Sequence, residues 1–586
     1  MAVLDSLKKR LKKRLHSAAP VSAVQEAAIR PKSRAEDHGH DHDDEKGQVS
    51  APVDPGVQTI EAAKALWGRH GRWLIIAGLG LVMTIYEIDN STVYIYNNYS
   101  TSSFGALSKL ASLSAAGSII FAIVKPPIAK VSNVIGRGQT YLLTISFYIL
   151  AYILMASATT FNTYAAGTIF YSVGQSGTNI MNDIVISDIT TARWRPFAIG
   201  LTFTPFLVTP WIAGFIVASV VSPTGIGWRW GIGMFAILMP FCASFIITTL
   251  LYYQAKAKKE DLAPRVKIGI VEFCSQIDLG GIILFSGGLA MILVPLTLAA
   301  TTSARWKTPY LDALIGIGCV LLIALPFYEK FMAKHPIVPV RYFLNRTIVC
   351  CLILIAVDSL GFACTHTYLY VWVTVAKGFA ARDATFFTYT NGVMQCLTGI
   401  LAGLLMGQLR RYKWIAVVGS VVRLVGYGVM LRLRGAENST GEIYVVQLIQ
   451  GLGSGMIQTC LLVPAQIVVI HAEMPQVTAL VICFSFVGGS IGACIAGGIY
   501  TNTLVPALWR YMPDGTQAAA INALANSITG VVPDWGTFER TAIALAFSDV
   551  MRYTTYAALG ASVIGLGFAL LLPNFVLPEK NNLVEE

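Results

Sequence analysis

The chain has 586 residues, of which 55% are hydrophobic and only 13% are charged. A soluble domain carries roughly 25% charged residues, so this composition excludes an ordinary water-soluble protein and predicts one embedded in a lipid bilayer. The formal net charge of +11 does not indicate a nucleic-acid partner, because much of the excess Lys and Arg lies in short loops between apolar runs, as the positive-inside rule expects.

The first segment, residues 1–71, is polar and is expected to be a disordered cytoplasmic tail. Within it Leu4, Leu7, Leu11 and Leu15 fall on one helical stripe surrounded by Lys and Arg. This pattern is typical of a helix lying on an anionic membrane surface, with a solvated basic tail as the alternative.

Fourteen apolar runs follow, each about as long as a helix needs to cross a hydrocarbon core. They are 73–97, 107–130, 140–158, 164–187, 197–221, 231–253, 280–300, 310–329, 348–376, 386–407, 414–433, 443–470, 478–502 and 554–573. An even number places both termini on one side, and the excess of Lys and Arg in the loops of that side predicts that it is cytoplasmic. The sequons at Asn98 and Asn438 fall on the predicted outside.

An internal repeat groups these spans. Gly174, Asn179 and Pro196 match Gly453, Gln458 and Pro475 at one constant offset. We therefore expect an N-terminal six-helix half (72–253), a linker with two inserted helices (254–345), a C-terminal six-helix half (346–575) and a cytoplasmic tail (576–586). Parallel six-helix repeats are the architecture of the major facilitator fold.

One long external connection, 503–553, lies inside the second half. It is predicted to form two amphipathic helical pieces, around 516–527 and 538–553. A loop of this length with its own structure is usually functional. A gating lid is one interpretation, and an ordered plug without gating is the other.

Four acidic residues interrupt the apolar runs: Glu87, Asp89, Asp183 and Asp358. An ionisable group inside a bilayer is costly, so it is a functional candidate by default. A buried carboxylate can bind and release a proton as its surroundings alternate, which predicts proton coupling. The alternative is a carboxylate that pins helices by pairing with hydroxyls or amides.

Uncharged polar and aromatic residues surround these acids and form the predicted binding site. They are Tyr86, Tyr94, Tyr96, Gln175, Asn179, Asn182, Tyr370, Tyr389, Asn391, Gln395, Gln450 and Gln458. Such a lining suits a large, hydrogen-bonding, weakly charged ligand, although interhelical hydrogen bonding is the alternative for each residue. The spans show no cluster with metal-ligand spacing and no nucleophile or nucleotide motif, so we expect a transporter without metal or cofactor rather than an enzyme.

Several motifs resemble a known family. The loop at 129–138, AKVSNVIGRG, is similar to the signature between the second and third helices of the major facilitator superfamily. The runs YEIDNSTVYIYNNYSTSSF (86–104), NDIVISD (182–188), GWRWG (227–231) and RRYKW (410–414), with the long external loop, resemble the fungal siderophore–iron transporter family. In the signature, Asn133 replaces an Asp beside Arg137, which implies a weaker gating latch. Phe547 replaces a loop Tyr that the family associates with substrate handling.

The resemblance implies proton-coupled import of ferric hydroxamate siderophores, ferrichrome-like complexes in which the chelator already satisfies the iron. Protons would be the coupling ion. A proton antiporter exporting glutathione or drugs is the alternative, and a non-transporting receptor is a third possibility that the repeat and the acids disfavour. We expect a monomer in the plasma membrane, with the endosomal or vacuolar membrane as the alternative.

Overall fold

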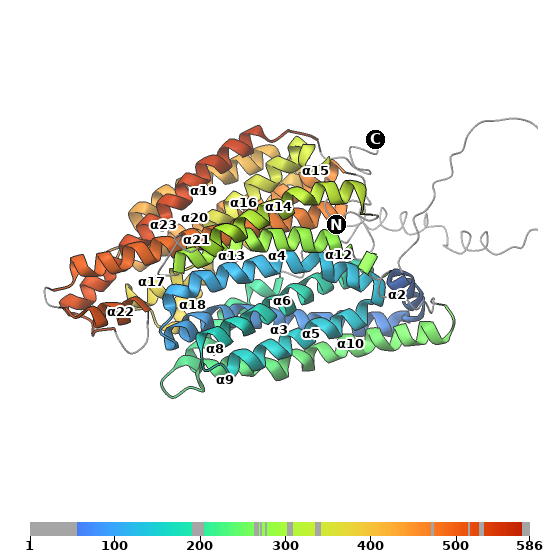
Figure 1. Ribbon diagram of the computed structural model, residues 1–586, viewed down its shortest axis with the longest axis horizontal. Helices are drawn as coiled ribbons and strands as arrows, with labels where there is room; N and C mark the ends of the chain where they lie inside the picture. The colour runs from blue at the N-terminus through green and yellow to red at the C-terminus, as the bar shows by residue number, and fades with distance from the viewer. Residues whose placement is uncertain are drawn as a thin grey trace, which may run out of the picture. The chain divides into compact units, whose positions relative to one another are not determined.

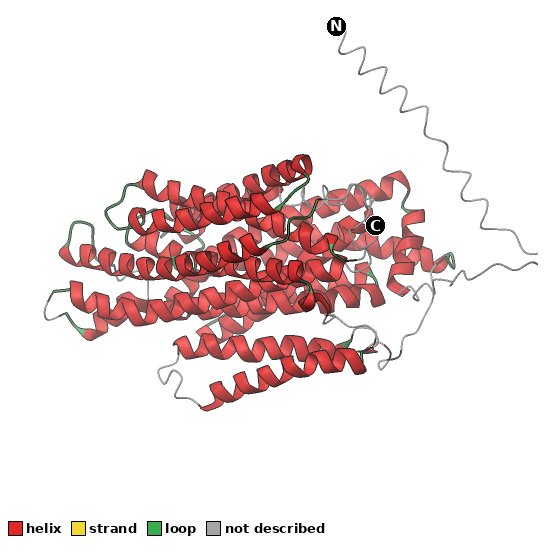
Figure 2. Ribbon diagram, turned by 90° about the horizontal axis from the view of Figure 1, so that it is seen from above, coloured by secondary structure: helices red, strands yellow, loops and turns green. Residues whose placement is uncertain are grey.

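The computed structural model describes residues 55–189, 204–262, 269, 272, 274–275, 278–301, 309–333, 341–469, 474–513, 516–526 and 532–576. All regular elements within these segments are helices (Figure 2), which confirms the all-α prediction. Eleven helical stretches are long and apolar enough to cross a membrane.

The N-terminal half is built from helices that the predicted spans anticipate. They are α3 (Gly68–Ser103), α4 (Leu110–Ile135), α5 (Arg137–Ala156), α6 (Phe161–Ile189), α8 (Thr209–Val221), α9 (Gly227–Gly233) and α10 (Phe235–Lys259). The chain turns between α4 and α5 at Gly136, whose φ of 108° favours glycine. α6 packs against α4 and α5, and α10 packs against α3 and α5.

The C-terminal half repeats this order. It contains α16 (Arg346–His366), α17 (Leu369–Val375), α18 (Ala381–Leu409), α19 (Lys413–Leu433), α20 (Thr440–Ile467), α21 (Met474–Tyr511) and α23 (Phe538–Leu571). The side chain of Asn345 caps α16 by accepting from the backbone of Thr347, and Ser439 with Glu442 forms a capping box that begins α20. α20 packs against α18 and α19, and α16 packs against α21 and α23.

The two halves meet along two helix pairs, α4 with α21 and α8 with α18. In Figure 1 the C-terminal helices α16, α19, α20 and α23 lie above the N-terminal helices α3, α5, α6 and α10. Between the halves in sequence come α12 (Leu279–Ile282), the π-helical turn η5 (Ile283–Gly287), α13 (Gly288–Thr301) and α14 (Pro309–Phe331). α13 packs against α14 and also contacts α4 and α21, so the inserted helices lie beside the α4–α21 contact.

Each of the fourteen predicted spans falls on a helix in the described part of the chain. Eleven meet the length and composition expected of a membrane span. The other three correspond to α6, which is rich in polar residues, to the short helix α8, and to the α12–α13 segment. The part of the predicted span 197–221 that precedes residue 204 lies outside the described residues.

Two expectations about where elements begin and end need correction. The predicted disordered tail ends before residue 71, because α2 (Pro55–Leu66) packs against α4 and α10 and buries Ile60 and Ala63; residues 1–54 lie outside the described residues. The external piece predicted at 538–553 is not a separate element, since α23 runs from Phe538 to Leu571 without a break. Among the described residues of that connection, α22 (Ala518–Asn526) is the one separate short helix.

The sequon at Asn98 gives no support to the predicted orientation. Asn98 lies inside α3, is 3% exposed, and donates to the carbonyl of Ile95. A side chain buried in this way is not an acceptor for a bulky surface glycan.

Candidate transport site

A cavity of about 260 Å³ lies between the two halves. Its lining residues are Tyr94, Ser114, Ser118, Ser359, Phe362, Ala363, His366, Thr367, Gln395, Gln458, Ser485, Phe486, Gly489 and Ala493. The lining therefore offers hydroxyl, amide and aromatic groups from α3 and α4 on one side and from α16, α18, α20 and α21 on the other. It includes no carboxylate, Lys or Arg.

Hydrogen bonds tie the two halves together at one end of the bundle. The hydroxyls of Tyr99 and Tyr370 are 2.8 Å apart, and Tyr368 donates to the carbonyl of Ser108 at 3.1 Å. Ser108 in turn donates to Asn526 of α22 at 2.8 Å. All of these residues lie at the end of the bundle predicted to be external. These contacts hold the two halves against each other at that end.

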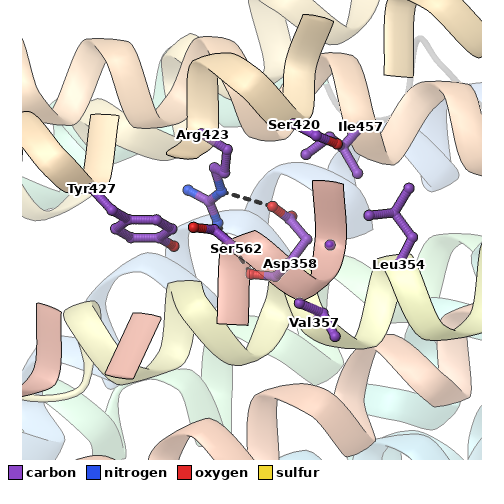
Figure 3. Close-up of a pocket in the computed structure, with 9 residues that line it drawn as sticks. Leu354, Val357, Asp358, Ser420, Arg423, Tyr427, Ile457 and Ser562 are labelled. Atoms are coloured by element: carbon purple, nitrogen blue, oxygen red, sulfur yellow. Dashed lines mark hydrogen bonds and ion pairs between the residues drawn. The ribbon is translucent and has the colours of Figure 1, made fainter. Parts of the chain in front are cut away.

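A buried ion pair organises the C-terminal half (Figure 3). Arg423 of α19 and Asp358 of α16 approach to 2.7 Å between Nε and Oδ1, and their side chains are only 2% and 1% exposed. The guanidinium also donates to the side chain of Gln450 at 2.8 Å, and Ser454 donates to the other oxygen of Asp358 at 2.9 Å. A cavity of about 10 Å³ beside the pair has roughly the space that one water needs.

The N-terminal half holds a carboxylate of a different kind. Asp89 of α3 is fully buried and accepts a hydrogen bond from the hydroxyl of Tyr171 at 2.9 Å. Its other oxygen has no hydrogen-bond partner among the described residues. The hydroxyls of Tyr148 and Tyr152 also lie near the carboxylate. Asp89 is therefore surrounded by phenols, with no cation paired to it.

The helix crossings beside these two acids are alike. Gly174 of α6 and Gly453 of α20 are a pair from the constant-offset match, and each allows a close helix crossing. A Cβ on Gly174 would lie 2.9 Å from the backbone nitrogen of Tyr148, and a Cβ on Gly453 would lie 2.9 Å from that of Arg423. Tyr148 in one half therefore takes the position that Arg423 takes in the other.

A buried cation lies near the third acid. Lys125 of α4 is 7% exposed and donates to Asn179 of α6 at 2.7 Å. Its ammonium lies 4.6 Å from the ring centre of Phe121, and it interacts electrostatically with Asp183. Asp183 thus has a cation nearby, which Asp89 lacks.

The fourth acid, Glu87, lies on the face of α3 that meets the other half. It is partly exposed and within electrostatic range of Tyr389 of α18. One of its carboxylate oxygens is buried without a hydrogen-bond partner among the described residues. This arrangement leaves it free to take up a proton or a ligand contact.

Of the predicted binding residues, Tyr94, Gln395 and Gln458 line the cavity. The others form interhelical contacts or lie in the protein core. Hydrogen bonds link Gln175 with Asn90, Asn182 with Tyr141, Tyr389 with the carbonyl of Ser91, Asn391 with the carbonyl of Gln447, Asn179 with Lys125, Gln450 with Arg423 and Tyr370 with Tyr99. Tyr86 and Tyr96 are buried in the N-terminal core.

The predicted gating residues lie at opposite ends of the bundle. Arg137 donates to the side chain of Asn133 at 2.7 Å and pairs with Asp188 of α6 at 3.0 Å. Asp188 thus supplies the negative charge that Asn133 lacks. Phe547 is 2% exposed in α23 and packs against Tyr500, whose ring stacks on that of Tyr368.

Sequence reasoning missed two cations that are buried within the spans, Lys125 and Arg423. Both stand in apolar runs, so the rule that selected the acids would also have selected them. Metal binding has no visible site: among the described residues no three His, Cys, Asp or Glu side chains lie together as possible metal ligands.

The arrangement of two similar halves around a central cavity agrees with comparisons to known proteins. The family model of the Major Facilitator Superfamily matches residues 71–394. The chain belongs to the Major Facilitator Superfamily. Its relatives in this superfamily are transporters rather than enzymes.

Curated relatives narrow the family further. The siderophore iron transporter mirC of Emericella nidulans is 31% identical over 93% of this chain and 91% of its own. Siderophore iron transporter 1 of Schizosaccharomyces pombe is 31% identical over 80% of this chain and 76% of its own length. The low affinity heme transporter str3 of the same yeast is 30% identical over 90% of this chain and 87% of its own length. The resemblance to fungal siderophore–iron transporters is thus confirmed.

Solved structures support the fold alone. A bacterial homolog of the human lysosomal transporter Spinster, in an inward-facing and unoccupied conformation, gives a TM-score of 0.58 at 14% identity. The match covers 86% of this chain and 97% of that one. The predicted major facilitator fold is therefore confirmed.

Proposed function

We propose that this superfamily member imports ferric hydroxamate siderophores, ferrichrome-like complexes, across a fungal membrane in symport with protons. The observation that carries the substrate class is the 31% identity to a siderophore iron transporter over 93% of the chain. A likeness along almost the whole length includes the helices that line the cavity.

The cavity chemistry supports this substrate. In a ferric hydroxamate the chelator satisfies the iron, and carbonyl, amide and apolar groups face outward. A lining of Ser, Gln, Tyr and Phe can hydrogen-bond and pack against such a surface without a metal ligand of its own. The cavity of about 260 Å³ is smaller than the roughly 300–1,000 Å³ that drug-sized ligands occupy, so the halves must separate further to admit the complex.

For proton coupling we propose the N-terminal acids, Glu87 and Asp89. A carboxylate that faces no cation is strongly favoured to accept a proton when it is buried, and to release it when water reaches it. Asp183 has Lys125 nearby and is a secondary candidate. Asp358 was predicted on the same grounds, but its pairing with Arg423 favours a fixed charge over a proton carrier.

Heme import is the second candidate, because the relative str3 is 30% identical over 90% of this chain. Heme carries carboxylates, which need cationic partners, and the cavity lining offers none. His366 lines the cavity, but its ring nitrogens lie 3.1 Å from Gln447 and from the carbonyl of Phe362.

Export of glutathione or drugs, the alternative from the sequence, gains no support from the relatives named above.

The proposal also covers the membrane, the oligomeric state and the orientation of the protein. We place it as a monomer in the plasma membrane, with an endosomal or vacuolar membrane as the alternative, and with both termini in the cytoplasm. The Lys and Arg excess of the loops on that side supports this orientation.

Uptake of radiolabelled iron tests the function directly. Cells that lack other uptake routes would receive the iron as several hydroxamate complexes or as heme, with and without a protonophore. We expect saturable uptake of at least one hydroxamate complex that the protonophore abolishes. No uptake of any hydroxamate complex, or uptake of heme alone, would contradict the proposal.

A further inference from the structure

The buried ion pair of the C-terminal half fixes the direction of a hydrogen-bond chain that ends at the cavity. We propose that this chain makes Gln395 a hydrogen-bond acceptor for the substrate, so that the site selects complexes carrying an outward N–H group. The inference rests on the proposed function and adds to it the feature of the siderophore that is recognised.

The chain begins at Arg423, which can only donate hydrogen bonds. Its Nε donates to Oδ1 of Asp358 at 2.7 Å, and a second guanidinium nitrogen donates to the backbone carbonyl of Asp358 at 3.1 Å. In this ion pair the carboxylate is the negatively charged partner, and an ionised carboxylate can only accept. Every further group that touches Asp358 must therefore donate to it.

The next links follow from this constraint. Ser454 donates to Oδ2 of Asp358 at 2.9 Å, and Nε2 of Gln458 donates to the same oxygen at 3.3 Å. Because the amide nitrogen of Gln458 faces the carboxylate, its oxygen faces the other way. That oxygen accepts from Nε2 of Gln395 at 2.7 Å.

The hydrogen bond to Gln458 also fixes the orientation of the Gln395 amide. The side-chain nitrogen of Gln395 donates to Gln458. The side-chain oxygen of Gln395, Oε1, forms no hydrogen bond with any described residue and is available as an acceptor. Gln395 and Gln458 both line the cavity. The wall therefore presents an amide oxygen, and reversing either amide would place two oxygens or two nitrogens against each other.

Close packing holds the two amides within reach. Gly451 and Gly455 of α20 face α18, where a Cβ on Gly451 would lie 3.1 Å from the backbone nitrogen of Gln395. Small residues at these positions let the helices approach closely enough for Gln395 and Gln458 to pair. Gln395 would touch the substrate, whereas Asp358 and Arg423 act through Gln458 as positioning residues.

An acceptor at this position discriminates between substrates. A backbone amide N–H of a peptide hydroxamate can donate to it. A carboxylate, such as those of heme, would bring a second acceptor against the amide oxygen, and a buried acceptor left without a donor is penalised. The chain therefore favours amide-bearing siderophores over anionic iron complexes.

The test compares a ferric hydroxamate peptide with its ester analogue, in which oxygen replaces the outward N–H groups without changing the shape. Initial uptake rates give KM and the maximal rate for each. For the unmodified chain we expect KM for the ester to be about tenfold higher, the factor expected from one hydrogen bond. Gln395→Leu should raise KM for the amide complex and bring the ratio of the two KM values close to one.

Two further variants separate positioning from folding. The double variant Asp358→Leu with Arg423→Leu removes the charge pair without leaving a lone charge, and should lower the KM ratio while surface expression persists. Gln466→Leu is the matched control, because Gln466 lies on α20 but pairs with Thr478 outside the cavity. It should leave the ratio unchanged.

The outcomes are distinct. An unchanged KM ratio in Gln395→Leu overturns the inference, even if hydroxamate uptake by the unmodified chain is robust. A ratio near one in the unmodified chain overturns it as well. Absence of hydroxamate uptake by the unmodified chain overturns the proposed function and this inference together.

Discussion

The first helix of each half carries a buried carboxylate, and the two carboxylates meet opposite surroundings. Asp89 of α3 accepts a hydrogen bond from the phenol of Tyr171 and is paired with no cation among the described residues. Asp358 of α16 accepts from Arg423, Ser454 and Gln458. The helix crossings that create these sites correspond, because Gly174 and Gly453 allow the same close approach.

One difference between the halves lies at this helix crossing. Where the C-terminal half has Arg423, the N-terminal half has Tyr148, a neutral residue of similar reach. A cation at this position holds a permanent negative charge, and a phenol leaves the acid able to exchange a proton. Under the proposed coupling, the C-terminal repeat would supply a fixed internal charge, and the N-terminal repeat would supply the site that changes its charge.

The largest expected effect comes from breaking the ion pair on one side only. Arg423→Leu leaves Asp358 buried without its counter-charge, which should lower the free energy of unfolding by about 3–5 kcal/mol. Adding Asp358→Leu should restore most of this loss, since a charge pair replaced by apolar residues is often tolerated. Thermal unfolding of the purified protein in detergent measures both.

The control is Arg432→Leu, which removes an exposed Arg from the same helix and should change the unfolding midpoint little. If Arg423→Leu were as stable as this control, the buried pair would not hold the C-terminal half together. A double variant as unstable as the single one would show that packing of the guanidinium, and not the charge, is what matters.

A smaller effect tests whether the helices cross equally closely in the two halves. Gly174→Ala and Gly453→Ala each place a Cβ 2.9 Å from a backbone nitrogen of the neighbouring helix. Both should destabilise the protein by about 1–3 kcal/mol, the usual cost of overpacking. Gly428→Ala, where nothing lies within 4 Å of the new Cβ, should be neutral or slightly stabilising. Unequal losses at Gly174 and Gly453 would break the correspondence.

Much of this fold is predictable from the sequence because its signals are local. Apolar run length predicts each span, and the constant offset that links Gly174 to Gly453 predicts two halves. The limits appear where helices extend beyond the hydrocarbon core. The segment after Phe538 is amphipathic and was predicted as a separate loop helix, but it continues into the last span as α23.

The site was harder to predict, because its chemistry depends on contacts between distant positions. Asp358 and Arg423 are 65 residues apart in the chain, and Gln395 and Gln458 are 63 apart. Sequence alone shows that such residues are polar and lie within spans, but not that Gln395 faces a cavity while Tyr96 packs in the core. The distinction between Asp89 and Asp358 likewise required knowing which side chains lie beside them.

The most direct test of the central claim is proton-driven accumulation in proteoliposomes that contain the purified protein. One proton moving through 100 mV supplies about 2.3 kcal/mol, enough for roughly fiftyfold accumulation of the ferric complex. Asp89→Asn should exchange labelled complex across the membrane but accumulate none, whereas the double variant Asp358→Leu with Arg423→Leu should still accumulate it. Full accumulation by Asp89→Asn, together with its loss in the double variant, would contradict the assignment of the proton site to the N-terminal half.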